Sequence, residues 1–539
     1  MTVQQSETQV LIVGGGPVGL TLAISLGQQG IRTVLIERME KPGFLPKMEL
    51  CNARTMEIYG RLGLADQIRA AGYPSDAPMD VIVTTSLNDE PLMRLVYPSV
   101  PEMQELIRTN NNGHWPREAY QRISQYTLEP LLKAVAEKTP NVTVRYGCAL
   151  MSLSEDDNGV TATVKTQAGE ETIRAAYLAG CDGASSTVRQ QLGIALKGGA
   201  GGPLQTQIFF RSDDLLQKHP LGAARHYPIA SARRTVLVTQ DDLRYYSVHI
   251  NADPPVDAQE LINEIVGAPV QVEILRKGNW TPSLLVAERY GSKRVFLAGD
   301  AAHQYIPTGG FGMNTGIGDA YDLSWKLVGT LQGWGGPQLL ASYEKERMPI
   351  GERNCRASEA ATIGSRTWRQ GFDPIVRDDT PKGHAKRAEL IALIDVGQRK
   401  SHEMHGIELG YRYAGSPLIA DEPGEGPALD NPVYEPTTWP GARLPHLWLS
   451  DGTALHDMMG EGYTVLNLGL GGPDAKMIAD ALKARGAPVK LVTVTEFEPR
   501  AIYGRNLLLL RPDLHVVWRG DEAPADVAHL AAVATGHAA

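Results

Sequence analysis

Residues 294–314, which read RVFLAGDAAHQYIPTGGFGMN, decide the fold of this chain. The apolar run at 295–298 predicts a strand that delivers one carboxylate, that of Asp300, to its carboxyl end. A glycine-rich turn and a predicted helix follow, and backbone N–H groups at such a place can bind an anion. The stretch therefore predicts a ligand site at the end of a late strand.

A second ligand-binding element stands near the start of the chain. The apolar run 9–13 stops at Gly14-Gly15-Gly16-Pro17-Val18-Gly19, and residues 20–26 then have helical apolar spacing. In such a fingerprint, Gly14 and Gly16 permit a tight turn and close approach to pyrophosphate, and Gly19 lets the helix pack on the strand. A second apolar run, 33–36, ends at Glu37, where an acid accepts ribose hydroxyls. This order predicts dinucleotide binding.

The fingerprint fits the AMP half of FAD and of a nicotinamide dinucleotide equally, because both carry adenosine and pyrophosphate. The late strand end separates the two. A second carboxylate, that of Asp300, suits the ribityl chain of FAD, and a simple nicotinamide dehydrogenase does not need it. We therefore expect one extended cofactor, FAD, held at both ends.

Length, composition and charge exclude several classes of protein. A chain of 539 residues predicts two to four domains, and a net charge of −9 offers no basic surplus for nucleic acid. The start has no apolar run behind basic residues, and nowhere do 18 apolar residues follow one another. We therefore expect a cytoplasmic protein without a membrane span. The four cysteines lack metal-ligand or CxxC spacing, which predicts reduced thiols and no metal site.

Three separated motifs carry a family resemblance. GGGPVGL at 14–20, CDGASSTVR at 181–189 and LAGDAAHQYIPTGGFGMNTGIGDAYDLSWKL at 297–327 occur in this order. Together they resemble the single-component (class A) flavoprotein aromatic hydroxylases, the group of para-hydroxybenzoate and phenol hydroxylases. The resemblance implies an α/β fold: a Rossmann-like (GR2-type) FAD-binding domain, an interleaved β-sheet substrate domain, and a C-terminal thioredoxin-like domain.

Domain boundaries follow from the resemblance and from strand-rich segments. We expect the FAD-binding domain at 1–77, 109–191 and 286–360, and the substrate domain at 78–108 and 192–285. Residues 361–440 read as a helix and a connector, and 441–539 as the thioredoxin-like domain, including the RPD…W signature of the phenol-hydroxylase branch. The last segment contains no cysteine, so dithiol chemistry is excluded and a packing or homodimer-forming role remains.

The resemblance assigns most of the cofactor-binding residues. Asp182, Gly183 and Arg189 would serve both FAD and the nicotinamide, and Asp300 would bind the ribityl hydroxyls. Gln125 would reach the flavin chain from a helix, and Arg122, one turn earlier on the same helix, would contact pyrophosphate. The full set of predicted FAD contacts is Gly14, Gly16, Pro17, Val18, Gly19, Glu37, Arg38, Arg54, Arg122, Gln125, Asp182, Gly183, Arg189, Asp300, Pro307, Gly310, Gly312, Met313 and Asn314.

Several of these assignments have structural alternatives. Asp182 would also cap a helix, and Arg122 and Gln125 would also fit a solvated helix face. Arg54 would also suit a plain surface helix, although family members place cations at its position and at that of Arg38. The chain departs from the family pattern at Ile306, where a first proline is frequent, and at Phe311, where glutamine is frequent.

The substrate pocket is the least determined part. The β-rich segments supply His226, Arg244, Tyr246 and His249 as candidates, with Tyr227 and Trp280 beside them. Strand alternation sends half of all side chains away from any cavity, so a core or surface role is the alternative for each. A histidine or tyrosine among them would serve as the base that removes a phenolic proton.

The activity that the resemblance implies is a monooxygenation. NADPH or NADH would reduce FAD, O₂ would add at the flavin C4a carbon, and the resulting hydroperoxide would hydroxylate a phenolic or polycyclic aromatic, as in aromatic catabolism. The alternatives are epoxidation or Baeyer–Villiger insertion on a non-phenolic substrate, or a flavin-binding protein without turnover. No second GxGxxG selects between the two nicotinamide cofactors.

Overall fold

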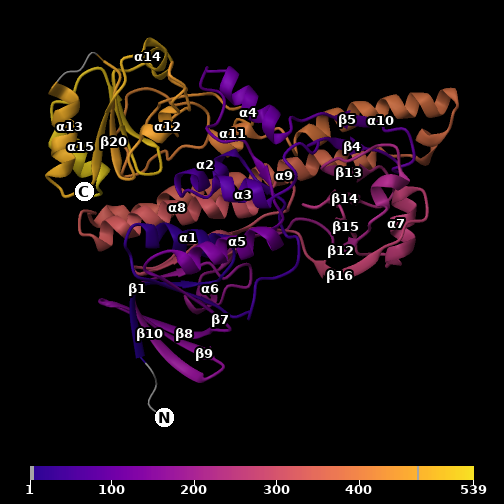
Figure 1. Cartoon of the computed structure of the whole chain (residues 1–539), viewed down its shortest axis with the longest axis horizontal. Helices are drawn as coiled ribbons and strands as arrows, with labels where there is room; N and C mark the ends of the chain where they lie inside the picture. Colours follow the sequence, from indigo (N-terminus) through magenta and orange to yellow (C-terminus); the bar gives the residue numbers. More distant parts are fainter. Residues whose placement is uncertain (1–4, 470–472, 539) are drawn as a thin grey trace.

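The computed structural model describes residues 5–469 and 473–538 and contains three parts (Figure 1). The N-terminal part is built on a seven-stranded sheet of order β7-β2-β1-β10-β9-β8, with β18 beside β10. Five of its strands run parallel: β1 (Gln5–Val13), β2 (Thr33–Glu37), β7 (Val142–Tyr146), β10 (Gly169–Gly180) and β18 (Val295–Leu297). β9 (Gly159–Thr166) pairs antiparallel with the first half of β10, and β8 (Ala149–Asp156) pairs antiparallel with β9.

Register places the three sequence motifs at one edge of this sheet. Val13 of β1 is paired with Gly180 of β10, and Gly180 is paired with Leu297 of β18. Parallel strands share the edge at which their carboxyl ends lie, so the segments that follow them meet there. Helices α1 (Pro17–Gln28), α5 (Gln125–Lys138) and α8 (Phe311–Leu331) lie together beside the sheet (Figure 1).

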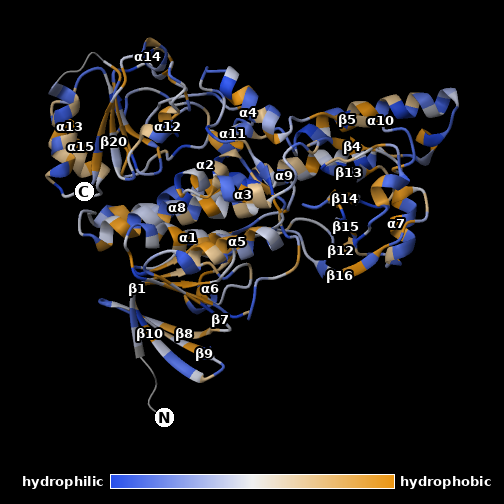
Figure 2. Ribbon diagram, in the orientation of Figure 1, coloured by the Kyte–Doolittle hydropathy of each residue, from blue (hydrophilic) through white to orange (hydrophobic). Residues whose placement is uncertain are grey.

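Hydrophobic patterning accounts for this core. The central strands carry consecutive buried apolar residues, at 10–13 in β1, 35–36 in β2, 178–179 in β10 and 295–297 in β18, as parallel strands buried between layers require. In Figure 2 the hydrophobic colours gather on α1, α5 and the strands beneath them, and the outer end of β9 is hydrophilic. The sequence reading of a buried strand–helix–strand start is therefore confirmed, with β1 beginning earlier than the apolar run itself.

The second part is a mostly antiparallel sheet of order β16-β12-β15-β14-β13-β4-β5, in which β13 and β4 are parallel, and we refer to it as the antiparallel sheet. One face packs on α7 (Ala258–Val266), and this core contains Phe210, Tyr227 and Val248. The opposite face turns toward the N-terminal part, because the Gln207 side chain donates to the Pro46 carbonyl and Phe209 contacts Phe44. We call it the inner face. The strands are β4 (Val81–Val83), β5 (Met93–Leu95), β12 (Gln205–Arg211), β13 (His226–Ile229), β14 (Thr235–Thr239), β15 (Tyr245–Asn251) and β16 (Glu273–Trp280).

Shorter elements connect these two sheets. β3 (Leu50–Cys51) pairs with β6 (Gln121–Arg122), and β17 (Ser283–Ala287) pairs with both β11 (Leu196–Ala200) and β19 (His303–Gln304). The 3₁₀ helices are Leu215–Lys218, Gly299–Ala301 and Pro374–Arg377. The remaining helices of this region are α2 (Ala53–Arg61), α3 (Ala65–Ala71), α4 (Val100–Thr109), α6 (Thr187–Gln191), α9 (Pro337–Gln370), α10 (Pro381–Arg399) and α11 (His405–Leu409).

The C-terminal part has thioredoxin-like connectivity. β20 (Tyr463–Asn467) and β21 (Val489–Thr493) are parallel and flank α13 (Pro473–Lys483), and β22 (Leu507–Leu510) and β23 (Val516–Gly520) follow as an antiparallel pair. α12 (Leu455–Met458), α14 (Phe497–Tyr503) and α15 (Val527–Ala534) complete it. Its core includes Trp325 of α8 and Leu339 of α9, so it packs on the long helices of the first part. In the ranges that the structure describes, no helix is both long and apolar enough to cross a bilayer.

Candidate cofactor and substrate site

The glycine fingerprint and the late strand end are in direct contact. A Cβ added to Gly299 would lie 3.0 Å from Val18, and one added to Gly316 would lie 2.6 Å from it. The Val18 side chain therefore packs against both glycines. The two predicted cofactor elements, far apart in the sequence, form one site.

The fingerprint glycines have different physical roles. Gly14 has φ +115°, and a Cβ there would lie 2.3 Å from the carbonyl oxygen of Cys181. A Cβ at Gly19 would lie 2.1 Å from the Gly14 carbonyl oxygen. At Gly16 the nearest atom to such a Cβ is a Glu129 oxygen at 3.9 Å. Gly14 and Gly19 are thus required by packing, and Gly16 leaves space for a ligand beside the turn.

Two helix N-termini offer free N–H groups. α1 begins at Pro17 with Gly16 as its N-cap, and α8 begins at Phe311 with Gly310, at φ +68°, as its N-cap. Neither N-cap has a side chain to accept a hydrogen bond, and neither first turn contains an acid. Uncapped helix N-termini bind anions through their N–H groups and the helix dipole. The pyrophosphate of FAD and the negatively charged, reduced form of its flavin ring are groups of the kind that these ends fit.

Two acids at the sheet edge are held by backbone N–H groups. The Glu37 carboxylate accepts from Gly15 N at 2.7 Å, which places it against the fingerprint turn. One oxygen of Asp182 accepts from Thr187 N at 2.7 Å and Val188 N at 3.1 Å, so this residue does cap α6. Its other oxygen is buried and has no partner among the described residues, and burial raises the pKa of the carboxyl. The cap therefore leaves one acceptor available to a ligand.

Asp300 lies in the short 3₁₀ helix, Gly299–Ala301, that follows β18. Its side chain is exposed to solvent, yet protein atoms surround it densely enough for desolvation to raise the pKa of its carboxyl. A carboxylate that is both accessible and surrounded by protein is typical of a group lining a binding recess. Gly312 of α8 lies opposite, because a Cβ there would be 3.9 Å from Asp300 Oδ1.

A buried network orders the turn that carries Asp300. Asp319 of α8 accepts from Gly299 N at 3.1 Å, contacts His303 Nε2 at 2.7 Å and accepts from Arg347 Nε at 2.8 Å. Burial raises the pKa of the Asp319 carboxyl, but His303 and Arg347 lower it further, and the net shift is downward. An ionised Asp319 thus holds the turn. The sequence analysis did not identify it, although it stands within the third family motif.

The glycine-rich turn after Asp300 has mixed surroundings. Pro307 is exposed, and Gly310, Gly312 and Met313 are half-buried at the start of α8. The Asn314 amide accepts from Asn52 N at 2.9 Å and donates to the Leu50 carbonyl at 3.0 Å, so it fixes β3 against α8. Gly183 has φ +80° and no atom within 4 Å of an added Cβ. Arg189 donates to the carbonyls of Ala184 and Ala301, which ties α6 to the Asp300 turn.

Lys47 is a cation that the sequence analysis missed. It lies near both Glu129 and Asp300 and lowers the pKa of each carboxyl against the larger, upward effect of burial. Gln125, the first residue of α5, donates to Glu129 at 2.5 Å. Arg38 is exposed. Of these basic side chains, Lys47 is the one placed between the fingerprint side of the site and the Asp300 side.

The structure corrects the placement of Arg122. We expected it on the helix of Gln125, but it belongs to the strand β6, and α5 begins after it. Its guanidinium is buried and pairs with Glu49 at 2.9 Å, donates to the Thr239 carbonyl and lies over the Tyr73 ring at 4.0 Å. Arg122 therefore joins the N-terminal part to the antiparallel sheet.

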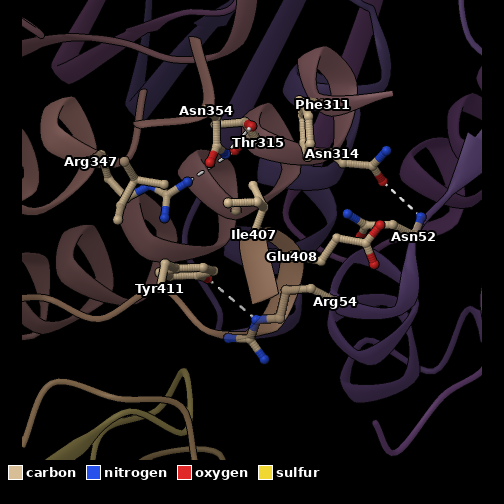
Figure 3. A pocket seen from close by; sticks show the side chains of 12 residues that line it. Asn52, Arg54, Phe311, Asn314, Thr315, Arg347, Asn354, Ile407, Glu408 and Tyr411 are labelled. Atoms are coloured by element: carbon tan, nitrogen blue, oxygen red, sulfur yellow. Dashed lines mark hydrogen bonds between the residues drawn. The ribbon is translucent and has the colours of Figure 1, made fainter. Parts of the chain in front are cut away.

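Arg54 is likewise not a surface residue. It donates to Tyr411 at 3.4 Å, to Glu57 at 3.3 Å and to the Asp513 carbonyl at 2.9 Å, which connects α2 to the C-terminal part. Figure 3 shows it in a polar cavity of about 20 Å³ behind the first turn of α8. That volume suits about one water and no aromatic ring. Glu408 lines the same cavity, and burial raises its pKa to about 7.

Two of the four substrate candidates lie on the inner face of the antiparallel sheet. His249 is paired with Gln207 and Val236, and His226 with Val238, and all belong to this face. Tyr246 belongs to the opposite face, where it packs in the α7 core and its hydroxyl donates to the Leu243 carbonyl at 2.5 Å. Tyr227 shares that core. Arg244 precedes β15 and pairs with Asp242 at 2.9 Å, half-exposed. Tyr246 and Tyr227 therefore face the α7 core and not the inner face, and Arg244 lies outside the strands.

His226 belongs to a polar cluster on the inner face. Its Nε2 lies 2.6 Å from Glu49, and its Nδ1 lies 3.3 Å from Nε2 of His402. Burial would raise the pKa of Glu49, but Arg225, His226 and Arg122 bring it well below its ordinary value. Burial lowers the pKa of His226, and lowers that of His402 to about 3, so both rings are neutral. Glu49 and His402 carried no signal in the sequence, since the cluster is assembled from distant segments.

These features define a class of protein. A dinucleotide fingerprint, a second carboxylate motif on the same sheet edge and a polar-faced antiparallel sheet beside them are the parts of an FAD-dependent aromatic hydroxylase. The chain belongs to that family: residues 7–358 match the FAD binding domain model, and residues 437–537 match the C-terminal domain model of aromatic-ring hydroxylases.

Known relatives extend over nearly the whole chain. It is 34% identical to the FAD-dependent monooxygenase apdD of Emericella nidulans, over 95% of this chain and 87% of the relative. It is 30% identical to a phenol 2-monooxygenase of a Pseudomonas species, over 96% of this chain and 91% of the relative. The structure of the rebeccamycin biosynthetic enzyme RebC with reduced flavin matches with a TM-score of 0.90 at 33% identity, covering 99% and 100% of the two chains.

Replacing Asp300 with alanine should weaken FAD binding about 10- to 150-fold, because a hydrogen bond to a charged group contributes about 1.5–3 kcal/mol. The ratio of flavin to protein absorbance after dialysis, and a fluorescence titration of the flavin-free protein with FAD, measure this change. Asp157→Ala is the matched control, since Asp157 is a surface residue that approaches Lys293 at 3.5 Å. Equal FAD affinity in Asp300→Ala and the control would show that this carboxylate does not bind the cofactor.

Proposed function

We propose that this FAD-dependent monooxygenase uses NADPH or NADH and O₂ to hydroxylate a phenolic or polycyclic aromatic ring. The observation that carries the proposal is the meeting of the Gly16 turn, Asp182 and Asp300 at one sheet edge, beside a sheet whose inner face presents His226 and His249. Closed-shell aromatics react poorly with triplet O₂. Bound FAD would supply the electron transfer to oxygen that makes the reaction possible. The residues below would hold it and prepare the substrate.

The chain's own groups suit the parts of FAD in order. Glu37 fits the ribose hydroxyls, the N-terminus of α1 with Lys47 fits the pyrophosphate, and Asp300 fits the ribityl hydroxyls. The free N–H groups at Gly310 and the start of α8 favour negative charge on the reduced ring. The inner face of the antiparallel sheet would cover the reacting side and exclude water.

The His226 cluster favours a phenolic substrate over a ketone or an alkene. We infer that His226 carries its proton on Nε2, where it donates a hydrogen bond to the Glu49 carboxylate. His402 likewise carries its proton on Nδ1, where it donates to the Gln398 carbonyl at 3.1 Å. The two facing ring nitrogens then both lack a proton, so each would accept a hydrogen bond from a phenolic hydroxyl that reached them. Two cations, Arg225 and Arg122, surround the single carboxylate of Glu49, so the cluster has a net positive charge. This positive charge favours a phenolate beside it.

Two further expectations belong to the proposal. The C-terminal part has a packing role within this chain, and a homodimer formed through it remains a prediction. Among the relatives, a phenol monooxygenase stands beside a biosynthetic enzyme, and a role in aromatic catabolism remains a prediction.

The test is substrate-stimulated oxidation of NADPH and NADH by the yellow protein, with a panel of phenols and hydroxylated polycyclic aromatics set against cyclic ketones. Reaction under isotopically labelled O₂, followed by mass spectrometry, should show one labelled oxygen in an aromatic product. Labelled lactone from a ketone would replace the proposal with Baeyer–Villiger chemistry. A yellow protein that no aromatic stimulates would point to flavin binding without turnover.

A further inference from the structure

One end of the inner face carries a hydrogen-bond donor without an acceptor. Trp280, the last residue of β16, is paired with Gln205 of β12, which has the same strand parity as Gln207 and so belongs to the inner face. Trp280 therefore projects on that face. Its Nε1 is buried and has no partner in the part of the chain that the structure describes. An indole N–H can only donate, so a ligand at this position must supply an acceptor.

His249 of β15 lies beside this indole. The centroids of the two rings are 6.3 Å apart in an edge-to-face arrangement, and His249 is paired with Gln207 on the same face. Burial, with Arg234 and His226 acting in the same direction, lowers the pKa of His249 to about 4, so the ring is neutral near pH 7. A neutral imidazole has one nitrogen that donates and one that accepts, and the partners of the ring decide which is which.

A buried chain of hydrogen bonds assigns these two roles. The Ser124 hydroxyl donates to the Gln240 amide oxygen, and the Gln240 amide nitrogen donates to the Ser247 hydroxyl oxygen at 3.2 Å. The Ser247 hydroxyl proton is then left to donate to His249 Nε2, which lies 3.4 Å away. His249 Nε2 is therefore the acceptor, and Nδ1 carries the ring proton. Within the described ranges the His249 ring makes this hydrogen bond and no other, so its Nδ1–H is a second free donor.

The two donors lie well away from the His226 end of the site. His226 of β13 shares a row of the inner face with Val238 and Ser247, and His249 lies two strands away and two residues farther along. Strands about 4.8 Å apart with a rise of about 3.4 Å per residue put the Cα atoms of His226 and His249 about 12 Å apart. A ligand that contacts both ends of the face must therefore be longer than a single aromatic ring.

The chemistry of the two donors selects a carbonyl oxygen. Such an oxygen has two lone pairs and no proton, so it accepts from both N–H groups at once. A hydroxyl in the same place would bring a proton of its own, which the two N–H groups could not accept. Both donors are uncharged, so they do not require an ionised partner. A neutral carbonyl therefore satisfies Trp280 and His249 together.

We propose that Trp280 and His249 bind a carbonyl oxygen of the substrate, at the end opposite to the phenol beside Glu49 and His226. The inference rests on the proposed function and narrows its substrate class to a hydroxylated aromatic ketone or quinone of at least two fused rings. The phenol and the carbonyl are then held at opposite ends of the ring system. This arrangement prevents the rings from turning in their own plane, so the same carbon is presented to the flavin in each turnover.

Binding of two probes of the same shape to the holoenzyme tests the proposal. The first, 6-acetyl-2-naphthol, carries a phenol and a carbonyl at opposite ends, and the second, 6-isopropenyl-2-naphthol, has a methylene group in place of the carbonyl oxygen. The flavin absorbance is titrated with each probe in the absence of NADPH and NADH. We expect the ketone to bind about 5- to 10-fold more tightly, because a hydrogen bond between uncharged groups has a net effect of this size.

Variants of the two donors should reduce the ratio of the two affinities. Trp280→Phe and His249→Phe should each lower it, and the double variant should abolish it. Ser247→Ala removes the hydroxyl that orients the imidazole, so it should also lower the ratio, and it covers the case in which a ring variant fails to fold. Trp325→Phe is the matched control and should keep the full ratio, because its Nε1 is likewise buried without a partner among the described residues but lies against the C-terminal part.

The possible results separate this inference from the proposed function. Equal affinity for the two probes, tighter binding of the isopropenyl probe, or no binding of either would overturn the inference. An unchanged ratio in the Trp280 and His249 variants would overturn it as well. A holoenzyme that prefers the ketone in the expected way, but oxidises neither NADPH nor NADH with any aromatic, would support the carbonyl site and contradict the hydroxylase assignment.

Discussion

Arg511→Met should lower the free energy of unfolding by about 3–5 kcal/mol, the cost of removing one partner from a buried ion network. Arg511 is the first residue of the RPD signature and is fully buried. Its guanidinium bonds Glu346 of α9 at 2.6 Å, Asp322 of α8 at 2.9 Å and Asp513 at 2.7 Å. Without it, three buried carboxylates would share Lys326 as the nearest strong cation, since Lys326 bonds Asp322 and Glu346.

Thermal unfolding followed by calorimetry, together with limited proteolysis, measures this change. The network joins the C-terminal part to the long helices, so the variant should release that part to proteases before the remainder unfolds. Arg505→Met is the control, because Arg505 is half-exposed and approaches Asp521 at 3.7 Å, a pair expected to contribute less than about 1 kcal/mol. Similar losses in both variants would show that the RPD arginine does not hold the interface.

Gly14→Ala should abolish FAD retention and lower the free energy of unfolding by about 2–6 kcal/mol. A non-glycine residue in a left-handed conformation costs about 1–3 kcal/mol, and overpacking costs about as much again. Both apply, since Gly14 has φ +115° and its added Cβ would lie 2.3 Å from the Cys181 carbonyl oxygen. The backbone there cannot move freely, because Cys181 N donates to the Val13 carbonyl at 2.8 Å and Gly14 N donates to the Ile36 carbonyl at 2.8 Å.

Flavin content and Tm of the purified variant are the measurements. Gly30→Ala separates the two causes, because Gly30 has φ +80° but no atom within 4 Å of an added Cβ. This control should show the backbone cost without the collision and should keep its flavin. A yellow Gly14→Ala protein with the Tm of the control would contradict the tight-turn explanation.

Much of the N-terminal fold was predictable, because its determinants are local. The apolar runs before Gly14 and Gly299 predicted strands with acids or glycines at their ends, and these strands are present as β1 and β18. The thioredoxin-like order of the C-terminal part was also predicted from alternating strands and a helix. This helix and β21 end within a residue or two of the expected limits. The long segment after 361 was less predictable, since a second helix, α10, occupies what read as connector.

The sequence could not predict which side chains of the antiparallel sheet face the cofactor, and the reason is physical. Both faces of that sheet are covered, one by α7 and one by the N-terminal part, so hydrophobic alternation does not tell which face borders the cofactor. Parity places Tyr246 and His249 on opposite faces of β15, but it does not tell which of these faces borders the cofactor. The strand β6 was missed because it is two residues long and owes its existence to pairing with β3.

The sequence by itself determined the chemical class of this protein, because glycines at φ > 0, strand-end acids and helix starts act within a few residues of one another. Only the tertiary structure decided which long polar side chains come into contact. Glu49, His226 and His402 meet from three distant segments, and Arg234 meets Arg369 across the sheet and α9. Charge compensation is a property of neighbours in space, and spacing along the chain does not encode it.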